Sequence, residues 1–125
     1  MFLYVLQLSS GKYYVGKTKN IFNRLLQHKQ NKGSKWTRKF SVLNLRYLFY
    51  SNEDLENSLT LVVMKKYGVT NVRGGKWVRE ELTKTESEKL QVLFQGVVDN
   101  LPYNRCIKND LSIRRGLLMK NDLVS

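Results

Sequence analysis

A chain of 125 residues and 14.7 kDa has the size of one domain, because a single hydrophobic core commonly serves chains of roughly 100–150 residues. Hydrophobic residues make up 42% of the chain and there is one proline, which argues against disorder along the whole length. The single cysteine and single histidine exclude an internal disulfide and a Cys/His zinc site, and the formal net charge of +12 at pH 7 predicts a polyanionic partner.

The start of the chain predicts a β-hairpin followed by a helix. Residues 2–8 and 12–15 are rich in aromatic and branched side chains, and the three residues between them include a glycine, which is typical of a hairpin. Thr18 or Asn20 can cap a helix that runs to about Lys29.

The middle of the chain predicts one further strand and two further helices. Residues 30–40 are polar and basic and indicate an exposed loop, whereas residues 42–50 are mostly apolar and indicate a strand covered on both faces. Helical spacing of apolar residues predicts helices over about 54–66 and 86–98. The segment 69–76 between them contains adjacent glycines and is predicted to be irregular.

These elements predict an α/β fold: a small, three-stranded, mainly antiparallel sheet flanked by helices, with a C-terminal helical extension. A short basic helix over 111–120 would belong to the extension.

The positive charge is concentrated in the first half of the chain. Residues 1–50 carry ten Lys and Arg and no acidic residue, whereas residues 51–125 carry twelve basic and ten acidic residues. Basic side chains in a folded segment without any carboxylate repel one another unless an external anion binds among them. This favours a nucleic-acid partner over the explanation that the charge only keeps the protein soluble.

Two features set expectations about location. No apolar run approaches the roughly 20 residues that span a bilayer. The N-terminus also lacks the basic and then apolar pattern of a signal peptide. We therefore expect no membrane partner and an intracellular location, in the cytoplasm or nucleus.

One set of residues resembles the GIY-YIG nuclease family. Tyr4, the run GKYYVGKT at 11–18, the pair Arg24 and His28, and an acid that opens the next helix carry the resemblance. It implies a nuclease-like domain over 1–78, with 79–125 as a helical extension packed on it. The pattern is closest to the compact branch that includes structure-specific endonucleases, and part of it is similar to members from large DNA viruses. Phe and Leu stand where the first family motif has Gly and Ile.

Taken alone, the candidate catalytic residues have ordinary explanations. Tyr4 and Tyr14 would pack across a hairpin, and Arg24 and His28 would share one exposed face of a helix. The resemblance implies instead that Tyr14 is the general base, made more acidic by nearby cations such as Lys17, and that Tyr4 orients the nucleophile or phosphate. It implies that Arg24 stabilises charge on the phosphate and that His28 relays a proton or hydrogen-bonds the phosphate.

An acid in the first turn of a helix is expected in any case, because it interacts with the positive end of the helix dipole. The resemblance implies that one such glutamate holds a single Mg²⁺ or Mn²⁺ ion, with water and phosphate completing the shell. Glu56 is the residue that we select. Glu53 and Asp54 remain alternatives, because the register between strand and helix is not determined by one sequence.

Other residues are assigned to substrate binding. Asn71 follows the helix of Glu56, where the family places an asparagine, although an asparagine is also common in loops for backbone reasons alone. The tryptophan of the basic loop could stack on a base or anchor the loop to the core. The substrate-binding set comprises Lys17, Lys35, Trp36, Thr37, Arg38 and Asn71.

The function predicted from these residues is that of a metal-dependent endonuclease that hydrolyses DNA phosphodiester bonds. The alternative is a basic DNA- or RNA-binding module on the same scaffold without turnover. A third hypothesis, binding to an anionic membrane, lacks the basic amphipathic helix that it requires.

Overall fold

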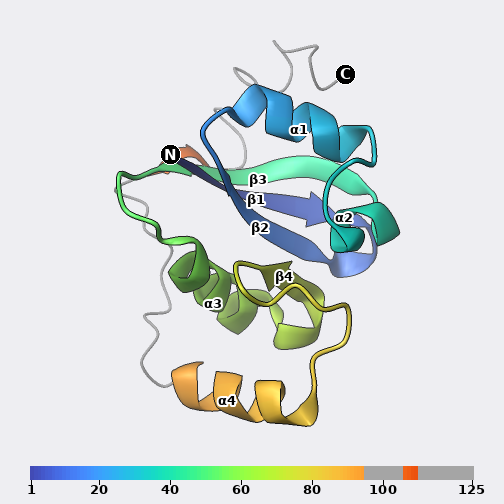
Figure 1. Cartoon of the computed structure of the whole chain (residues 1–125), viewed down its shortest axis with the longest axis vertical. Helices are drawn as coiled ribbons and strands as arrows, with labels where there is room; N and C mark the ends of the chain where they lie inside the picture. Colours follow the sequence, from blue (N-terminus) through green and yellow to red (C-terminus); the bar gives the residue numbers. More distant parts are fainter. Residues whose placement is uncertain (95–105, 110–125) are drawn as a thin grey trace.

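The computed structural model describes residues 1–94 and 106–109, which form a mixed α/β fold around one sheet (Figure 1). The sheet has five strands in the order β4-β2-β1-β3-β5. The strands are β1 Phe2–Leu8, β2 Tyr13–Thr18, β3 Val42–Tyr50, β4 Val72–Gly74 and β5 Cys106–Asn109.

The centre of the sheet agrees with the sequence prediction. β1 pairs with both β2 and β3 in antiparallel fashion, so that Tyr4 lies opposite Gly16 on one side and Leu48 on the other. The hairpin turns through a 3-10 segment, Ser9–Gly11, in which Ser10 and Gly11 both have positive φ. Glycine reaches this conformation without strain, which explains its position in the turn.

The number of strands was underestimated, because the sheet has five strands rather than three. β4 lies in the segment predicted to be irregular and runs parallel to β2, and β5 pairs antiparallel with β3. Both strands are short and polar or glycine-rich, so their side chains carry no alternating pattern. Their pairing depends on backbone hydrogen bonds with distant strands, which a local pattern does not encode.

In the described residues, four α-helices flank the sheet. They are α1 Ile21–Lys29, α2 Lys35–Lys39, α3 Glu56–Tyr67 and α4 Lys84–Phe94, and a second 3-10 segment, Val69–Asn71, precedes β4. α1, α3 and α4 agree with the predicted helices within a few residues, and positions 95–98 of the last prediction lie outside the described residues, as does the predicted helix over 111–120. None of the described helices is long and apolar enough to cross a membrane.

The prediction of an exposed loop over 30–40 was wrong in its second half. Ser34 caps α2 by accepting a hydrogen bond from the Thr37 backbone N–H at 3.2 Å, and both Trp36 and Thr37 are buried. Only five residues form this helix, which is too few for a periodic apolar stripe to reveal it.

Helices cover both faces of the sheet (Figure 1). On one face Tyr4 and neighbouring strand residues pack against Ile21 and Leu25 of α1 and against Trp36 of α2. On the other face the intervening strand residues pack against α3 and against Leu90 of α4, which is completely buried. Alternate residues of β1 therefore enter two separate cores, which is the reason for its continuous apolar sequence. The division into a domain over 1–78 and an extension over 79–125 stays a prediction.

Candidate active site

Tyr4 and His28 form the buried centre of the candidate site. Tyr4 points from β1 toward α1, where its hydroxyl lies 2.8 Å from His28 Nε2 and accepts a hydrogen bond from Arg24 Nε at 3.2 Å. Both Tyr4 and His28 are almost completely buried. Burial raises the pKa of the Tyr4 phenol far above its ordinary value, and burial together with the charge of Arg24 lowers the pKa of His28 to about 3. Both groups are therefore neutral at pH 7.

Tyr14 lies beside this pair on β2. Its ring centroid is 6.3 Å from that of Tyr4 and 5.2 Å from that of His28. It keeps 8% of its surface exposed, whereas Tyr4 keeps none. Burial raises the pKa of Tyr14, and hydrogen bonding and charge from Arg24 act against that rise. Of the two phenols, Tyr14 is the one that solvent reaches.

Arg24 lies at the surface edge of the cluster. Position 24 is four residues, or about one helical turn, before His28 on α1, so both side chains reach the same side of the helix. Its Nε donates to Tyr4 and its Nη1 donates to Gln27 Oε1 at 2.9 Å. The guanidinium is partly exposed and carries its full positive charge at the opening of the buried cluster.

Glu56 reaches the same cluster from the opposite face of the sheet. β4 pairs only with residues 13–15 of β2, so within the described residues the end of β2 has no neighbour on that side. α3 begins at this open edge, where Lys17 Nζ lies 2.5 Å from Asp54 Oδ2 and 4.0 Å from Glu56 Oε1. The negative charge of Glu56 raises the pKa of both Tyr4 and Tyr14, so its carboxylate acts on both phenols.

Glu56 differs from the two neighbouring acids in its surroundings. Its side chain is 17% exposed, against 59% for Asp54, and Glu53 is exposed as well. Burial raises the pKa of Glu56, and the charge of Lys17 acts against that rise. Asp54 uses one oxygen to bind Lys17 and the other to accept the Glu56 backbone N–H at 3.2 Å. The half-buried carboxylate near the phenols is therefore that of Glu56.

The residues fit a single divalent cation held by one carboxylate. Within the described residues, the Glu56 carboxylate accepts no hydrogen bond and forms an ion pair with Lys17 at 4.0 Å, so its oxygens can coordinate a cation. In the described part of the chain, no three or more His, Cys, Asp or Glu side chains are arranged so that they could hold a metal ion together. Mg²⁺ is often bound by one or two carboxylates with water and substrate phosphate, which is the arrangement that this site allows.

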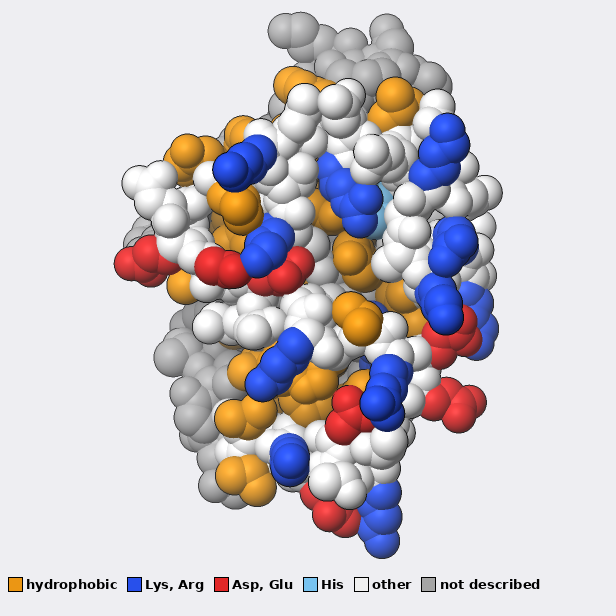
Figure 2. Space-filling view, in the orientation of Figure 1, with side chains coloured by type: hydrophobic (Ala, Val, Ile, Leu, Met, Phe, Trp, Pro, Cys, Tyr) orange, Lys and Arg blue, Asp and Glu red, His pale blue; other side chains and the backbone are white. Residues whose placement is uncertain are grey.

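The predicted substrate-binding residues are not all brought together. Lys17, Lys35 and Arg38 are exposed, and Lys17 lies beside Glu56. Trp36 is buried and donates its indole N–H to the Tyr13 carbonyl at 2.9 Å, so it anchors α2 to β2, the second of its two predicted roles. Figure 2 shows basic side chains over the whole of this face, without acidic ones among those in its upper part.

Asn71 lies at the far end of α3 from Glu56. Its amide donates to the Tyr67 carbonyl and accepts from Lys12 Nζ, both at 2.9 Å. Glu56 begins α3 and Asn71 follows its end, and the twelve residues of this helix extend for about 18 Å at 1.5 Å per residue. The structure therefore does not bring Asn71 into contact with the cluster of Tyr4, Tyr14, Arg24 and Glu56.

Comparison with known proteins identifies the family. A family model described as the GIY-YIG catalytic domain matches residues 1–67, which is more than half of the chain. The chain belongs to the GIY-YIG family. Among its relatives are two UPF0213 proteins of Streptococcus pneumoniae, one from serotype 4 (strain TIGR4) and one from strain R6. Each is 36% identical over 67 residues, which cover 52% of this chain and 68% of the relative. No solved structure matches the chain.

Membership has a functional meaning. GIY-YIG domains are generally endonucleases that act on DNA and depend on a divalent metal ion, so a nuclease-type function is the one that the family supports. The two relatives carry no activity in their names.

Two glycines of this GIY-YIG domain make room for the site: Gly16, which sequence reasoning used only as part of the run at 11–18, and Gly33, to which it assigned no role. A Cβ at Gly16 would meet the Tyr4 hydroxyl, and a Cβ at Gly33 would meet the His28 ring and the Thr37 hydroxyl. The Gly16 contact joins two paired strands, whereas the Gly33 contact is local and joins the end of α1 to the start of α2. The spacing of Ser34 and Thr37, a helix-capping pattern, could have indicated the turn that carries Gly33.

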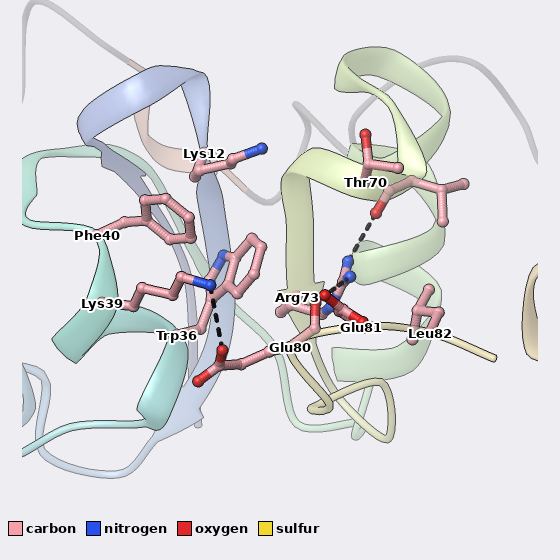
Figure 3. Close-up of a pocket in the computed structure, with 10 residues that line it drawn as sticks. Lys12, Trp36, Lys39, Phe40, Thr70, Arg73, Glu80, Glu81 and Leu82 are labelled. Atoms are coloured by element: carbon pink, nitrogen blue, oxygen red, sulfur yellow. Dashed lines mark hydrogen bonds and ion pairs between the residues drawn. The ribbon is translucent and has the colours of Figure 1, made fainter.

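A pocket of about 420 Å³ lies apart from this cluster, between α2 and the segment that follows β4 (Figure 3). Lys39 crosses it to Glu80 at 3.2 Å, and Arg73 stacks on Trp36 with 4.7 Å between the guanidinium carbon and the ring centroid. The Arg73 guanidinium donates to four backbone carbonyls, those of Val69, Val72, Arg79 and Glu80. These bonds hold residues 79–80 against β4. None of the residues that line the pocket belongs to the cluster of Tyr4, Tyr14, Arg24 and Glu56.

Acidification from pH 7 to pH 5 is expected to lower the free energy of unfolding by about 2 kcal/mol through His28 alone. The folded protein keeps His28 neutral because its pKa is about 3, whereas the unfolded chain binds a proton below the ordinary value of 6.5. Stability is therefore lost as the pH falls below 6.5. Urea unfolding of the wild type and of His28→Gln at both pH values checks this, and an equal pH response of the two proteins would contradict it.

Proposed function

We propose that this protein is a divalent-metal-dependent endonuclease that hydrolyses phosphodiester bonds of DNA. The observation that supports it most is that the charges of Arg24 and Glu56 both act on the phenol of Tyr14, and that Glu56 lies beside Lys17 at the open end of the same strand. The basic surface of the first fifty residues provides the complementary charge for a DNA backbone.

In this proposal Tyr14 is the general base. The base is the phenolate form of Tyr14, which the neighbouring Arg24 charge favours against the effect of burial. Because Tyr14 keeps access to solvent, its phenolate can accept a proton from a water molecule that attacks the phosphorus atom and so return to the phenol. Tyr4 has no exposed surface and is held by His28 and Arg24, so it orients Arg24 from within.

Arg24 and Lys17 supply positive charge where the phosphate gains negative charge. A planar guanidinium can bind two phosphate oxygens at once, and Arg24 reaches the opening of the site with its outer nitrogens. Glu56 would hold Mg²⁺ or Mn²⁺, which would supply charge stabilisation at the leaving oxygen.

The remaining basic residues of the predicted set extend the binding surface. Lys35 and Arg38 are exposed on α2, next to the turn that contacts His28. Each phosphate neutralised by such residues releases condensed counterions, so affinity for DNA should fall steeply with added salt.

The test is incubation of the purified protein with branched and linear DNA at low salt, with Mg²⁺, with Mn²⁺ and with chelator. Cleavage that requires the metal ion supports the proposal. Retarded migration of DNA without any nicking would favour the non-catalytic binding module, and cleavage that persists in chelator would contradict the mechanism.

Replacing Tyr14 with phenylalanine is expected to lower the cleavage rate by about a hundredfold while DNA binding is retained, because only the proton acceptor is removed. Since burial raises the pKa of Tyr14, the phenolate fraction at neutral pH is small and the wild-type rate should increase as the pH rises from 7 to 9. Rate measurements across this range on wild type and Tyr14→Phe check both statements. Tyr13→Phe on the same strand, with its ring on the opposite face against Tyr67, is the matched control. An unchanged rate in Tyr14→Phe would remove Tyr14 from the mechanism.

A further inference from the structure

His28 is enclosed by hydrogen-bonding partners on both ring nitrogens. Nε2 lies 2.8 Å from the Tyr4 hydroxyl, and Nδ1 lies 3.1 Å from Thr37 Oγ1. Both His28 and Thr37 are 1% exposed, and Tyr4 is not exposed at all. A neutral imidazole carries one N–H, so one nitrogen must donate and the other must accept. Which one donates determines the direction of every hydrogen bond in the cluster.

The Thr37 hydroxyl has a partner that can only accept. Its Oγ1 lies 3.1 Å from the backbone carbonyl of Ser34, to which it donates. With its hydrogen on that carbonyl, the Thr37 oxygen accepts from His28 Nδ1–H. His28 Nε2 then accepts from the Tyr4 hydroxyl, and the Tyr4 oxygen accepts from Arg24 Nε–H. Every donor in this sequence has an acceptor.

The reverse direction leaves one buried hydrogen without an acceptor. If Thr37 donated to Nδ1, Nε2 would donate to the Tyr4 oxygen, which already accepts from Arg24 Nε. The Tyr4 hydrogen would then face only donors among the hydrogen-bond partners that the structure gives it. An unsatisfied donor in a site from which water is excluded is costly, so the first direction is favoured.

We infer that Thr37 is a positioning residue that holds His28 in the tautomer with the proton on Nδ1, and that it orients Arg24 through His28 and Tyr4. The inference rests on the proposed function only for its effect on cleavage. Thr37 thereby acts on Arg24 through three successive hydrogen bonds and does not touch the substrate. The sequence had instead predicted a direct substrate contact for Thr37.

The turn around Thr37 is shaped for this contact. Gly33 has no side chain to separate the His28 ring from the Thr37 hydroxyl, because a Cβ there would overlap both. Ser34 caps α2 and fixes the first turn of that helix, in which Thr37 lies. The short helix α2 therefore brings a hydroxyl to the histidine at a defined position.

The test uses the fact that His28 is the only histidine of the chain. Nitrogen-15 NMR of the imidazole reports directly which ring nitrogen carries the proton. In the wild type we expect a protonated Nδ1 and an unprotonated Nε2. The opposite assignment in the wild type would overturn the inference without any variant, and without any bearing on whether the protein cleaves DNA.

Thr37→Val removes the acceptor for Nδ1–H with little change of shape, and Thr37→Ser keeps it. In the valine variant we expect the Nε2–H tautomer to become populated and the metal-dependent cleavage rate to fall by about tenfold, while the serine variant restores both. Backbone amide spectra of the two variants show whether each is folded. A valine variant that is folded and keeps both the wild-type imidazole spectrum and the wild-type rate would overturn the inference. If no protein of the set cleaves DNA, the proposed function fails while the tautomer result still stands.

Discussion

Glu56→Gln is expected to abolish metal-dependent cleavage of DNA while leaving DNA binding nearly intact. Glutamine has the same size as glutamate, but its neutral amide oxygen is a weak ligand for the hard cation that we propose Glu56 holds as the single carboxylate ligand. Removing the metal removes charge stabilisation of several kcal/mol from the transition state. Cleavage assays with Mg²⁺ and Mn²⁺, together with gel shifts on the same DNA, measure the two effects separately.

Asp54→Asn and Glu53→Gln are the matched controls for Glu56, because they remove an equal charge from the same turn of chain. Asp54 is exposed and binds Lys17, and Glu53 is exposed, so both variants should retain most of the activity. Full activity in Glu56→Gln together with loss in Asp54→Asn would transfer the metal site to Asp54. Full activity in all three variants would rule out a carboxylate-bound metal at this edge.

Arg24→Ala is expected to reduce the cleavage rate by about two to three orders of magnitude, because one preorganised donor to a developing anion is commonly worth that much. The substitution also removes the hydrogen bond to the buried Tyr4 hydroxyl. Single-turnover rates at saturating protein separate this effect on the chemical step from weaker DNA binding.

Arg38→Ala is the matched control, since Arg38 is exposed on α2 and should change affinity and its salt dependence more than the rate. Arg24→Lys keeps the charge but lacks the planar group that can hold Tyr4 and a phosphate together, and an intermediate rate is expected. Equal single-turnover rates for wild type and Arg24→Ala would exclude Arg24 from transition-state stabilisation.

Local patterns were sufficient for the elements that carry Tyr4, Tyr14, Arg24 and His28. The aromatic and branched side chains of residues 2–8 and 12–15 and the glycine turn predicted the hairpin, and the four-residue spacing predicted that Arg24 and His28 share one side of α1. The expectation that this side of α1 is exposed was wrong for His28, because its side chain is buried. It is 1% exposed because Tyr4 and the turn at Gly33 cover it.

Residues whose role depends on distant partners were harder to place. Thr37 and Trp36 were predicted within an exposed loop, but both are buried, because a five-residue helix folds them against β2 and His28. Asn71 was assigned by its place in the chain, yet α3 separates it from Glu56. Whether these residues contact substrate stays a prediction.

The sequence by itself determined the central strands, the main helices, the concentration of positive charge and the set of candidate catalytic side chains. The strands, the helices and the charge distribution follow from composition or from periodicities within about ten residues, whereas the candidate catalytic side chains follow from the resemblance to the GIY-YIG family. Only the tertiary structure decided that the sheet has five strands, that the charge of Glu56 acts on both phenols, and that Thr37 faces the histidine. The first two features arise from pairing and packing between segments far apart in the chain, and the third from a helix of five residues, and side-chain patterning carries no signal for any of them.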